Sequence, residues 1–375
     1  MNRNKQIIVW TDRPPFFTKT PFIYLSNSNK YRVSFLYRRD DKQIDRKSVH
    51  GTGKYENCEL LDCKEIISSR ETLIDFLNKN KDAIHIVNGF YISHFLKYKE
   101  FKKMYPESKV FLLTEKPQTF RKPQCLFKPL LGFSSFIRAL RNKKYIDGVL
   151  AFGEDACSYF QKHGWNKNKI HNFIYSFDFD SLMEINFQKK NDFNSFKFLY
   201  IGRFDFNIKG VNYLLKAIDS LDANIDNCSF DFVGGYGDNS KDVLSFIEQH
   251  KNCKFSGQVP FYDVFNKITQ CDCVIVPSVK DGWNINVLQA LCCGKPVIAT
   301  TGTGSENLVS KFGYGEVCKK KDAKALKEAI EKIIREKESY LKYENNALKY
   351  SKYFSNKLLG EFISNVIDDK KGKLY

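Results

Sequence analysis

The sequence predicts an α/β protein made of two doubly wound parallel sheets, each in its own domain. Short β-branched or aromatic runs alternate with helical stretches along the whole chain, a rhythm typical of parallel α/β sheets. The chain of 375 residues also exceeds the size at which one hydrophobic core keeps growing. The alternation restarts after the polar run 188–195, which places a domain boundary there.

The expected strands of the first half are 6–10, 32–37, 84–87, 110–114 and 148–152. Those of the second half are 197–201, 230–233, 253–255, 273–276 and 296–299. We expect an N-terminal domain over 1–187, a second domain over 188–345, and a helical tail over 346–375 whose return to the first domain is left open. Two doubly wound domains in tandem predict ligand binding at the carboxyl ends of their strands, in a central cleft.

Composition narrows the class of protein. No apolar run is long enough to span a bilayer, and the eleven scattered cysteines contain no CxxC pair, so we expect buried thiols in a reducing, cytoplasmic compartment. The net charge of +17, concentrated in the first half, favours an anionic partner such as an acidic membrane or a phosphorylated acceptor. No nucleic-acid-binding motif is visible.

The first candidate site follows the strand that opens the second domain. Gly202 allows a tight exit from this strand, and Arg203 and Lys209 come next, just before a helix. Cations and free backbone N–H groups at such a position suit a diphosphate, although an isolated Arg and Lys in a loop are more often solvated surface. A glycine cluster around Gly235 ends the next strand and suits close approach to a nucleotide or an ordinary turn.

The strongest segment is CVIVPSVKDGWNINVLQALCCGKPVIAT, over 273–300. Here a buried strand leads into a turn containing Asp281, and Asn284 is a plausible N-cap for the helix that follows. Gln289 lies eight residues after Asp281, about one turn into that helix. One of these side chains can meet a sugar while the other meets a ribose on the same ligand.

The ordered landmarks GR–KG, VGG-G, PS–D-x7-Q-A, CGKPVIAT and G-G-S-E resemble the donor domain of retaining glycosyltransferases of family 4, which have the GT-B fold. The resemblance covers about residues 196–310 and implies two facing Rossmann-like domains. The family has a second glutamate where this chain has Gln289, and we expect weaker or altered nucleotide binding rather than its loss. No metal or other cofactor is expected, because this class generally uses fixed cations.

The resemblance also implies the role of each residue. Arg203 and Lys209 would hold the donor diphosphate, and Asp281 with the backbone N–H groups of Trp283 and Asn284 would fix the transferred sugar. The remaining donor-binding candidates are Gly202, Gly235, Gln289 toward the ribose, and Glu306, whose role is less defined.

The first domain offers fewer candidates. Asp12 and Arg13 follow its first strand, and Glu115 follows another strand and suits an acceptor hydroxyl or a simple capping role. The stretch 127–144 mixes apolar residues with Arg138, Arg141, Lys143 and Lys144, a pattern typical of a helix on an anionic bilayer. The alternative is a helix packed on its own sheet.

These features together predict a cytoplasmic enzyme, peripheral on the inner face of the membrane. It would move a hexose or N-acetylhexosamine from a nucleoside diphosphate sugar, UDP first, to a lipid-linked bacterial surface glycan such as capsule or lipopolysaccharide. One alternative is a synthase with a soluble sugar-phosphate or glucan acceptor. The other is a catalytically silent GT-B module that binds carbohydrate or a partner, which Gln289 keeps open.

Overall fold

A computed structural model describes residues 5–11, 18–37, 57–89, 95–116, 143–182, 189–222, 227–370 and 374. The chain forms two compact units. One holds the described residues up to Asp178 together with those from Ser355 onward, and the other holds Phe179–Phe354. The first domain boundary expected from the sequence, after residue 187, lies outside the described residues, so the expected domain limits stay predictions.

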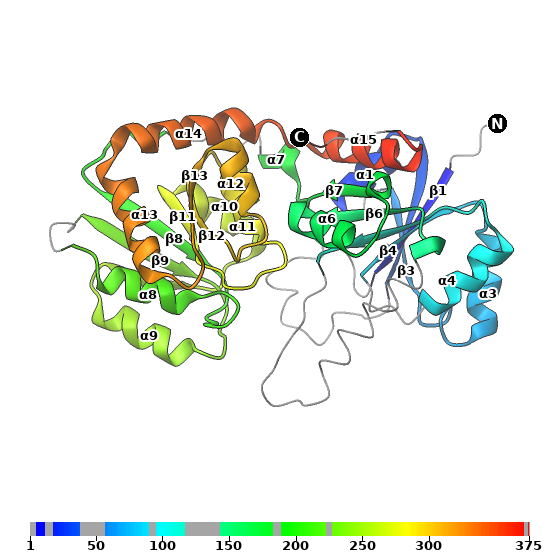
Figure 1. Ribbon diagram of the computed structural model, residues 1–375, viewed down its shortest axis with the longest axis horizontal. Coiled ribbons are helices and arrows are strands. Elements are labelled where there is room, and N and C mark those ends of the chain that lie inside the picture. The colour runs from blue at the N-terminus through cyan, green and yellow to red at the C-terminus, as the bar shows by residue number, and fades with distance from the viewer. Residues whose placement is uncertain are drawn as a thin grey trace. The chain divides into compact units, whose positions relative to one another are not determined.

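The first unit contains a parallel sheet of seven described strands in the order β3-β2-β1-β4-β5-β6-β7 (Figure 1). Its strands are β1 (Lys5–Thr11), β2 (Tyr31–Tyr37), β3 (Cys58–Asp62), β4 (Ile84–Asn88), β5 (Val110–Thr114), β6 (Gly148–Phe152) and β7 (Ile170–Phe173). The helices are α1 (Thr20–Asn27), α3 (Arg70–Lys79), α4 (Phe95–Met104), α6 (Gly153–Lys162) and α15 (Asn356–Ile367), with the short 3₁₀ turns η2 (Lys143–Tyr145) and η3 (Lys167–Lys169).

The C-terminal helix α15 belongs to the first unit although it follows the second in sequence (Figure 1). It packs on α1, and its Phe362 stacks on Phe173 of β7 with 5.8 Å between the ring centroids. The hydroxyl groups of Tyr31 and Ser364 share a hydrogen bond of 3.0 Å beneath the helix. The last helix therefore completes the hydrophobic core of the first unit.

The second unit contains a parallel sheet of six described strands in the order β10-β9-β8-β11-β12-β13. Its strands are β8 (Phe196–Ile201), β9 (Cys228–Val233), β10 (Cys253–Gly257), β11 (Cys273–Val276), β12 (Val297–Thr300) and β13 (Gly315–Cys318). The helices are α7 (Phe179–Leu182), α8 (Val211–Asp219), α9 (Ser240–Gln249), α10 (Phe261–Thr269), α11 (Ile285–Cys292), α12 (Glu306–Phe312), α13 (Ala323–Arg335) and α14 (Lys337–Ser351). Taken in chain order, the strands follow the Rossmann order 3-2-1-4-5-6, which reverses between β8 and β11.

Helices cover both faces of this second sheet (Figure 1). Helix α8 packs against α9 and α13, whereas α11 packs against α10, α12 and α14. The amphipathic α8 turns Val211, Leu214 and Ile218 into the core, and each such side chain contributes roughly 1.5–3 kcal/mol when fully buried. Helix α11 differs because all residues from Asn286 to Cys292 are buried, so its polar side chains need internal partners.

The predicted fold class, two parallel-sheet Rossmann-like domains, is confirmed. All ten predicted strands are present, and the sequence analysis omitted β3, β7 and β13. The predicted helix over 71–80 corresponds to α3, whereas most of the stretch 127–144 lies outside the described residues. The cysteines in the described ranges are free. Burial raises the pKa of Cys253 to about 12, so this thiol is protonated at neutral pH.

Gly210, at the start of α8, is required by both backbone conformation and space. It has φ of +66°, and a Cβ atom there would lie 2.1 Å from the Pro277 carbonyl oxygen. Gly257 has a similar φ of +73° but has open space around the same position. We predict that Gly257→Ala lowers the free energy of unfolding by about 1 kcal/mol through backbone strain alone. Gly210→Ala should lower the free energy of unfolding by about 1–3 kcal/mol more than Gly257→Ala, because the backbone at Pro277, where the chain leaves β11, must move.

Urea unfolding of the two variants beside the unchanged protein measures this difference. Equal losses for both glycines would show that the contact between the β8 and β11 loops contributes nothing beyond backbone conformation.

Candidate active site

The candidate site lies at the carboxyl edge of the second sheet, where the strand order reverses. β8 and β11 are neighbours there, and open α/β sheets bind ligands at this position. Gly202 and Arg203 leave the end of β8, and the turn containing Asp281 follows β11. The topology therefore brings together two motifs that are separated by about seventy residues in the sequence.

Asp205 shapes the loop after β8. Its carboxylate oxygen Oδ1 accepts hydrogen bonds from the backbone N–H groups of Asn207 and Ile208, at 2.9 and 2.8 Å. Its carbonyl oxygen accepts from the N–H groups of Lys209 and Gly210. This is an Asx-type turn, and it fixes the backbone of Lys209 at the start of α8. The sequence analysis missed Asp205, although an Asp four residues before a Lys-Gly pair is a turn signal.

The loops after β8 and β11 are joined by backbone and side chain. The Ile208 carbonyl accepts from the N–H groups of Val279 and Lys280, at 2.9 and 3.2 Å. The ammonium of Lys209 lies 2.5 Å from Oδ2 of Asp281, and both side chains are about one-fifth exposed. The structure thus places two predicted site residues in direct contact.

Arg203 differs from Lys209. It is exposed, and among the residues that the structure describes no acidic side chain lies within 4 Å of its guanidinium. The buried Tyr200 hydroxyl donates to the Arg203 carbonyl at 2.8 Å. Burial, helped by the charges of Asp205 and Asp281 and opposed by Arg203, raises the pKa of Tyr200 far above its usual value, so this donor stays protonated. The backbone of Arg203 is therefore held by Tyr200, while its guanidinium faces solvent.

The loop after β12 closes over the Asp281 turn. The Asp281 N–H donates to the Gly302 carbonyl at 2.8 Å, and the Asn284 N–H donates to the Thr303 carbonyl at 3.1 Å. The backbone N–H of Asn284, which the sequence analysis assigned to the sugar, thus has a partner within the protein, and its role toward a sugar stays a prediction. The Asn284 side chain caps α11, accepting from the Asn286 N–H at 2.9 Å. Trp283, between these residues, is 4% exposed.

Two buried side-chain amides on α11 contrast with each other. Asn286 donates to the Ile201 carbonyl at 2.8 Å, which ties the helix to the end of β8. Gln289 lies three residues further on the same helical face and is 1% exposed. Neither its amide oxygen nor its amide nitrogen hydrogen-bonds to any described residue. An unsatisfied buried amide costs roughly 1–3 kcal/mol, which marks Gln289 as a group that lacks a polar partner in the free protein.

The other predicted donor-site residues occupy the same edge. Gly202 and Gly234 approach so closely that a Cβ on Gly234 would lie 2.1 Å from the Gly202 carbonyl oxygen. Gly235 packs against the side chain of Gln258. Glu306 is the first residue of α12, where its carboxylate suits the positive end of the helix.

Three of the residues predicted in the first unit, Glu115, Lys143 and Lys144, lie in the described ranges. Glu115 follows β5 and accepts a hydrogen bond from the Tyr175 hydroxyl. Lys143 donates to the Gly164 carbonyl at 3.0 Å, and Lys144 lies 5.2 Å from the ring centroid of Tyr145. The predictions on Asp12, Arg13, Arg138 and Arg141 fall outside the described residues.

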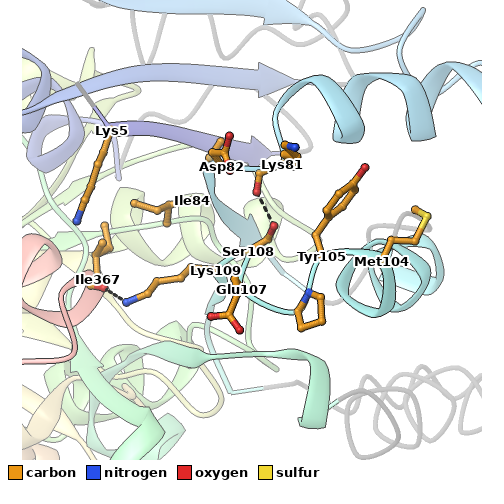
Figure 2. Close-up of a pocket in the computed structure, with 12 residues that line it drawn as sticks. Lys5, Lys81, Asp82, Ile84, Met104, Tyr105, Glu107, Ser108, Lys109 and Ile367 are labelled. Atoms are coloured by element: carbon orange, nitrogen blue, oxygen red, sulfur yellow. Dashed lines mark hydrogen bonds between the residues drawn. The ribbon is translucent and has the colours of Figure 1, made fainter. Parts of the chain in front are cut away.

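A pocket of about 460 Å³ opens at the amino edge of the first sheet, near Lys5, Ile84 and Lys109 (Figure 2). Lys109 donates to the Ile367 carbonyl at 2.5 Å and pairs with Asp369 at 2.7 Å, and Lys5 pairs with Asp368. None of the predicted site residues lines this pocket. Lys5 and Lys109 thus join the C-terminal segment to the sheet.

In the described ranges, no group of three or more His, Cys, Asp and Glu residues is arranged to hold a metal ion. Among the helices described, none combines the length and apolar character needed to cross a bilayer.

Comparison with known proteins supports the resemblance seen in the sequence. Residues 183–350 match the family model of glycosyl transferases group 1. A glycosyltransferase of Methanocaldococcus jannaschii, MJ1178, is 29% identical over 39% of this chain and 41% of its own length. The N,N'-diacetylbacillosaminyl-diphospho-undecaprenol alpha-1,3-N-acetylgalactosaminyltransferase of Campylobacter jejuni is 27% identical over 41% of this chain and 39% of its own. The chain thus matches about two-fifths of the length of these relatives.

Solved structures match almost the whole fold. HepE of Anabaena, in complex with UDP, has a TM-score of 0.71 at 13% identity, over 97% of this chain and 99% of that chain. The lipopolysaccharide outer core galactosyltransferase WaaB has a TM-score of 0.71 at 14% identity, also over 97% and 99%. At these identities the likeness establishes the fold of two Rossmann-like domains.

The contrast between Gln289 and Asn286 gives a test of the site. We predict that Gln289→Met raises the free energy of unfolding by about 1 kcal/mol, because it replaces an unsatisfied amide by an apolar group of similar size. The same variant should bind UDP more weakly. Asn286→Leu is the matched control on the same helix. It should lower the free energy of unfolding by about 1–3 kcal/mol, because the Ile201 carbonyl loses its side-chain donor.

Urea unfolding and calorimetric titration with UDP measure both effects. A Gln289→Met protein that loses stability, or that keeps full UDP affinity, contradicts the assignment of Gln289 to a ligand.

Proposed function

We propose that the protein is a retaining glycosyltransferase with a UDP-sugar donor and a lipid-linked bacterial surface glycan as acceptor. The transferred group would be a hexose or N-acetylhexosamine. The observation that carries this proposal is the placement of two cations, Arg203 and Lys209, on the loop after β8, while the unsatisfied amide of Gln289 lies on the helix after β11, the strand next to β8 at the point where the strand order reverses. The group 1 domain over residues 183–350 supports the same class of reaction.

In this proposal the two cations neutralise the diphosphate as it leaves the sugar. Arg203 has its guanidinium exposed, and Lys209 is held at the start of α8, where backbone N–H groups and the helix dipole also favour negative charge. Stabilising charge that develops on a leaving group is the largest electrostatic contribution that fixed groups make to such a reaction. The Gln289 amide oxygen would accept a hydrogen bond from a ribose hydroxyl, and its NH₂ would donate to the hydroxyl oxygen.

The donor and acceptor classes rest on different support. HepE was solved with UDP and glucose, which favours a UDP-sugar donor. The name of the Campylobacter jejuni relative describes transfer to a sugar-diphospho-undecaprenol, which favours a lipid-linked acceptor. The basic excess of the whole chain, +17, suits an enzyme that works on the inner face of an anionic membrane.

Arg203→Ala should lower the rate of donor hydrolysis or transfer about a hundredfold, because one transition-state charge partner is lost. A panel of UDP-, GDP- and ADP-sugars, assayed by nucleotide release, identifies the donor first. Lys254→Ala removes an exposed lysine on β10 of the same unit and is the matched control, expected to keep the unchanged rate. Full activity in Arg203→Ala with a verified donor rules out the phosphate role, and no turnover or binding of any donor favours the silent-module alternative.

Membrane binding is tested separately through the four cations of 127–144. Each cation near an anionic surface contributes about 1 kcal/mol, so replacing Arg138, Arg141, Lys143 and Lys144 by Gln should strongly reduce co-sedimentation with anionic vesicles. Donor hydrolysis should persist, because the donor residues belong to the other unit. Unchanged protein that ignores anionic vesicles at low salt would instead favour a soluble acceptor.

A further inference from the structure

Most of the acceptor capacity of the Asp281 carboxylate is used within the protein. Its Oδ2 accepts from the Lys209 ammonium at 2.5 Å, from the Asn284 side-chain amide at 3.0 Å and from the Ser278 hydroxyl at 3.3 Å. Its Oδ1 accepts from the backbone N–H of Gly282 at 3.1 Å. An ionised carboxylate offers about two lone-pair sites on each oxygen, so the three donors saturate Oδ2 and one site is left on Oδ1. A sugar hydroxyl donating to Oδ2 would have to displace one of these donors, the Lys209 ammonium among them.

Lys209 has the opposite balance. Its ammonium carries three N–H donors and uses one of them on Asp281. The remaining two can reach phosphate oxygens without breaking the ion pair. The lysine stem has four rotatable bonds, and fixing it before the donor arrives reduces the entropy that binding must overcome. Asp281 therefore has the contacts of a group that orients the cation.

The surrounding backbone holds both partners of the Lys209–Asp281 ion pair in place. Asp205 fixes the Lys209 backbone, and Gly302 accepts from the Asp281 N–H, so both ends of the ion pair have a rigid base. Arg203, the other cation of the site, has no comparable clamp among the described residues. The site thus combines one pre-oriented cation with one exposed cation.

From these contacts we infer that Asp281 is a positioning residue that acts on the donor through Lys209, by holding the lysine ammonium where it meets the diphosphate. This inference deepens the proposed function and rests on it. It departs from the sugar-contacting role that the sequence predicted for Asp281. The difference is measurable, because a sugar contact matters only for a UDP-sugar, whereas a clamp on Lys209 matters equally for UDP, which has no sugar.

The experiment is a double-mutant cycle with Asp281→Asn and Lys209→Met, in which UDP and a UDP-sugar are titrated by calorimetry. Asp281→Asn should weaken both ligands by a similar factor, about tenfold, and should have little further effect in the Lys209→Met background, because groups that act as a unit are not additive. Asp272→Asn is the matched control. It breaks the Lys190–Asp272 ion pair, 3.0 Å long, before β11 and so at the opposite edge of the sheet, and should leave both affinities unchanged whatever it does to stability.

Several results would overturn the inference. Asp281→Asn that binds UDP like the unchanged protein but loses UDP-sugar affinity would establish a direct sugar contact, and additive effects in the cycle would separate Asp281 from Lys209. If the unchanged protein binds no nucleotide, the proposed function is wrong. The part of the inference that concerns the donor is then wrong too, whereas the hold of Asp281 on Lys209 is tested without a ligand.

The hold of Asp281 on the Lys209 ammonium can also be measured without a ligand. The acylation rate of Lys209, followed by peptide mass spectrometry, should rise several-fold in Asp281→Asn relative to Asp272→Asn. An equal rate in the two variants would show that Asp281 does not hold the lysine.

Discussion

The joining of the β8 and β11 loops is the constraint on which the rest of the site depends. These strands are neighbours at the point where the strand order reverses, so their loops leave the sheet side by side. The Ile208 carbonyl accepts two backbone N–H groups from the β11 loop, and Gly210 leaves room for Pro277. Without that contact, Lys209 and Asp281 would be two surface charges, and an exposed ion pair contributes little. With it, a cation is held at the start of a helix.

The buried helix α11 carries two polar side chains into the core beside the site. A helix buried on all sides has no water to satisfy its polar groups, so Asn286 and Gln289 are unusual there. Asn286 contributes to the fold because its amide reaches the end of β8. Gln289 reaches no described partner, so its amide lowers the stability of the free protein. A ligand that supplied hydrogen-bond partners for the Gln289 amide would raise the free energy of unfolding, because it would bind the folded protein and not the unfolded chain.

The sequence predicts central strands well and edge strands poorly. β3, β7 and β13, which the sequence analysis omitted, each lie at the edge of a sheet. β1 and β11 are almost fully buried and appear as apolar runs, whereas β3 is largely exposed and has no such run. At the candidate site the sequence analysis named Lys209 and Asp281, which the structure brings into contact, because motif order along the chain reflects loop order at the carboxyl edge. It did not indicate that the backbone N–H of Asn284 and the Asp281 carboxylate have partners within the protein, because these partners, Thr303 and Lys209, come from other loops.

The choice of glutamine at position 289 follows from the same burial. An ionised glutamate, 1% exposed and without a partner, would cost several kcal/mol more than an amide, since a buried charge without compensation is far more expensive than a buried dipole. A carboxylate there would make the stronger hydrogen bond to a ribose hydroxyl, but the free protein would carry the larger penalty. Glutamine keeps an acceptor at this point of the helix at the smaller cost. The residue therefore favours stability of the free domain over strength of a single contact. In the proposed function, Lys209 and the exposed Arg203 then supply the charges that meet the diphosphate.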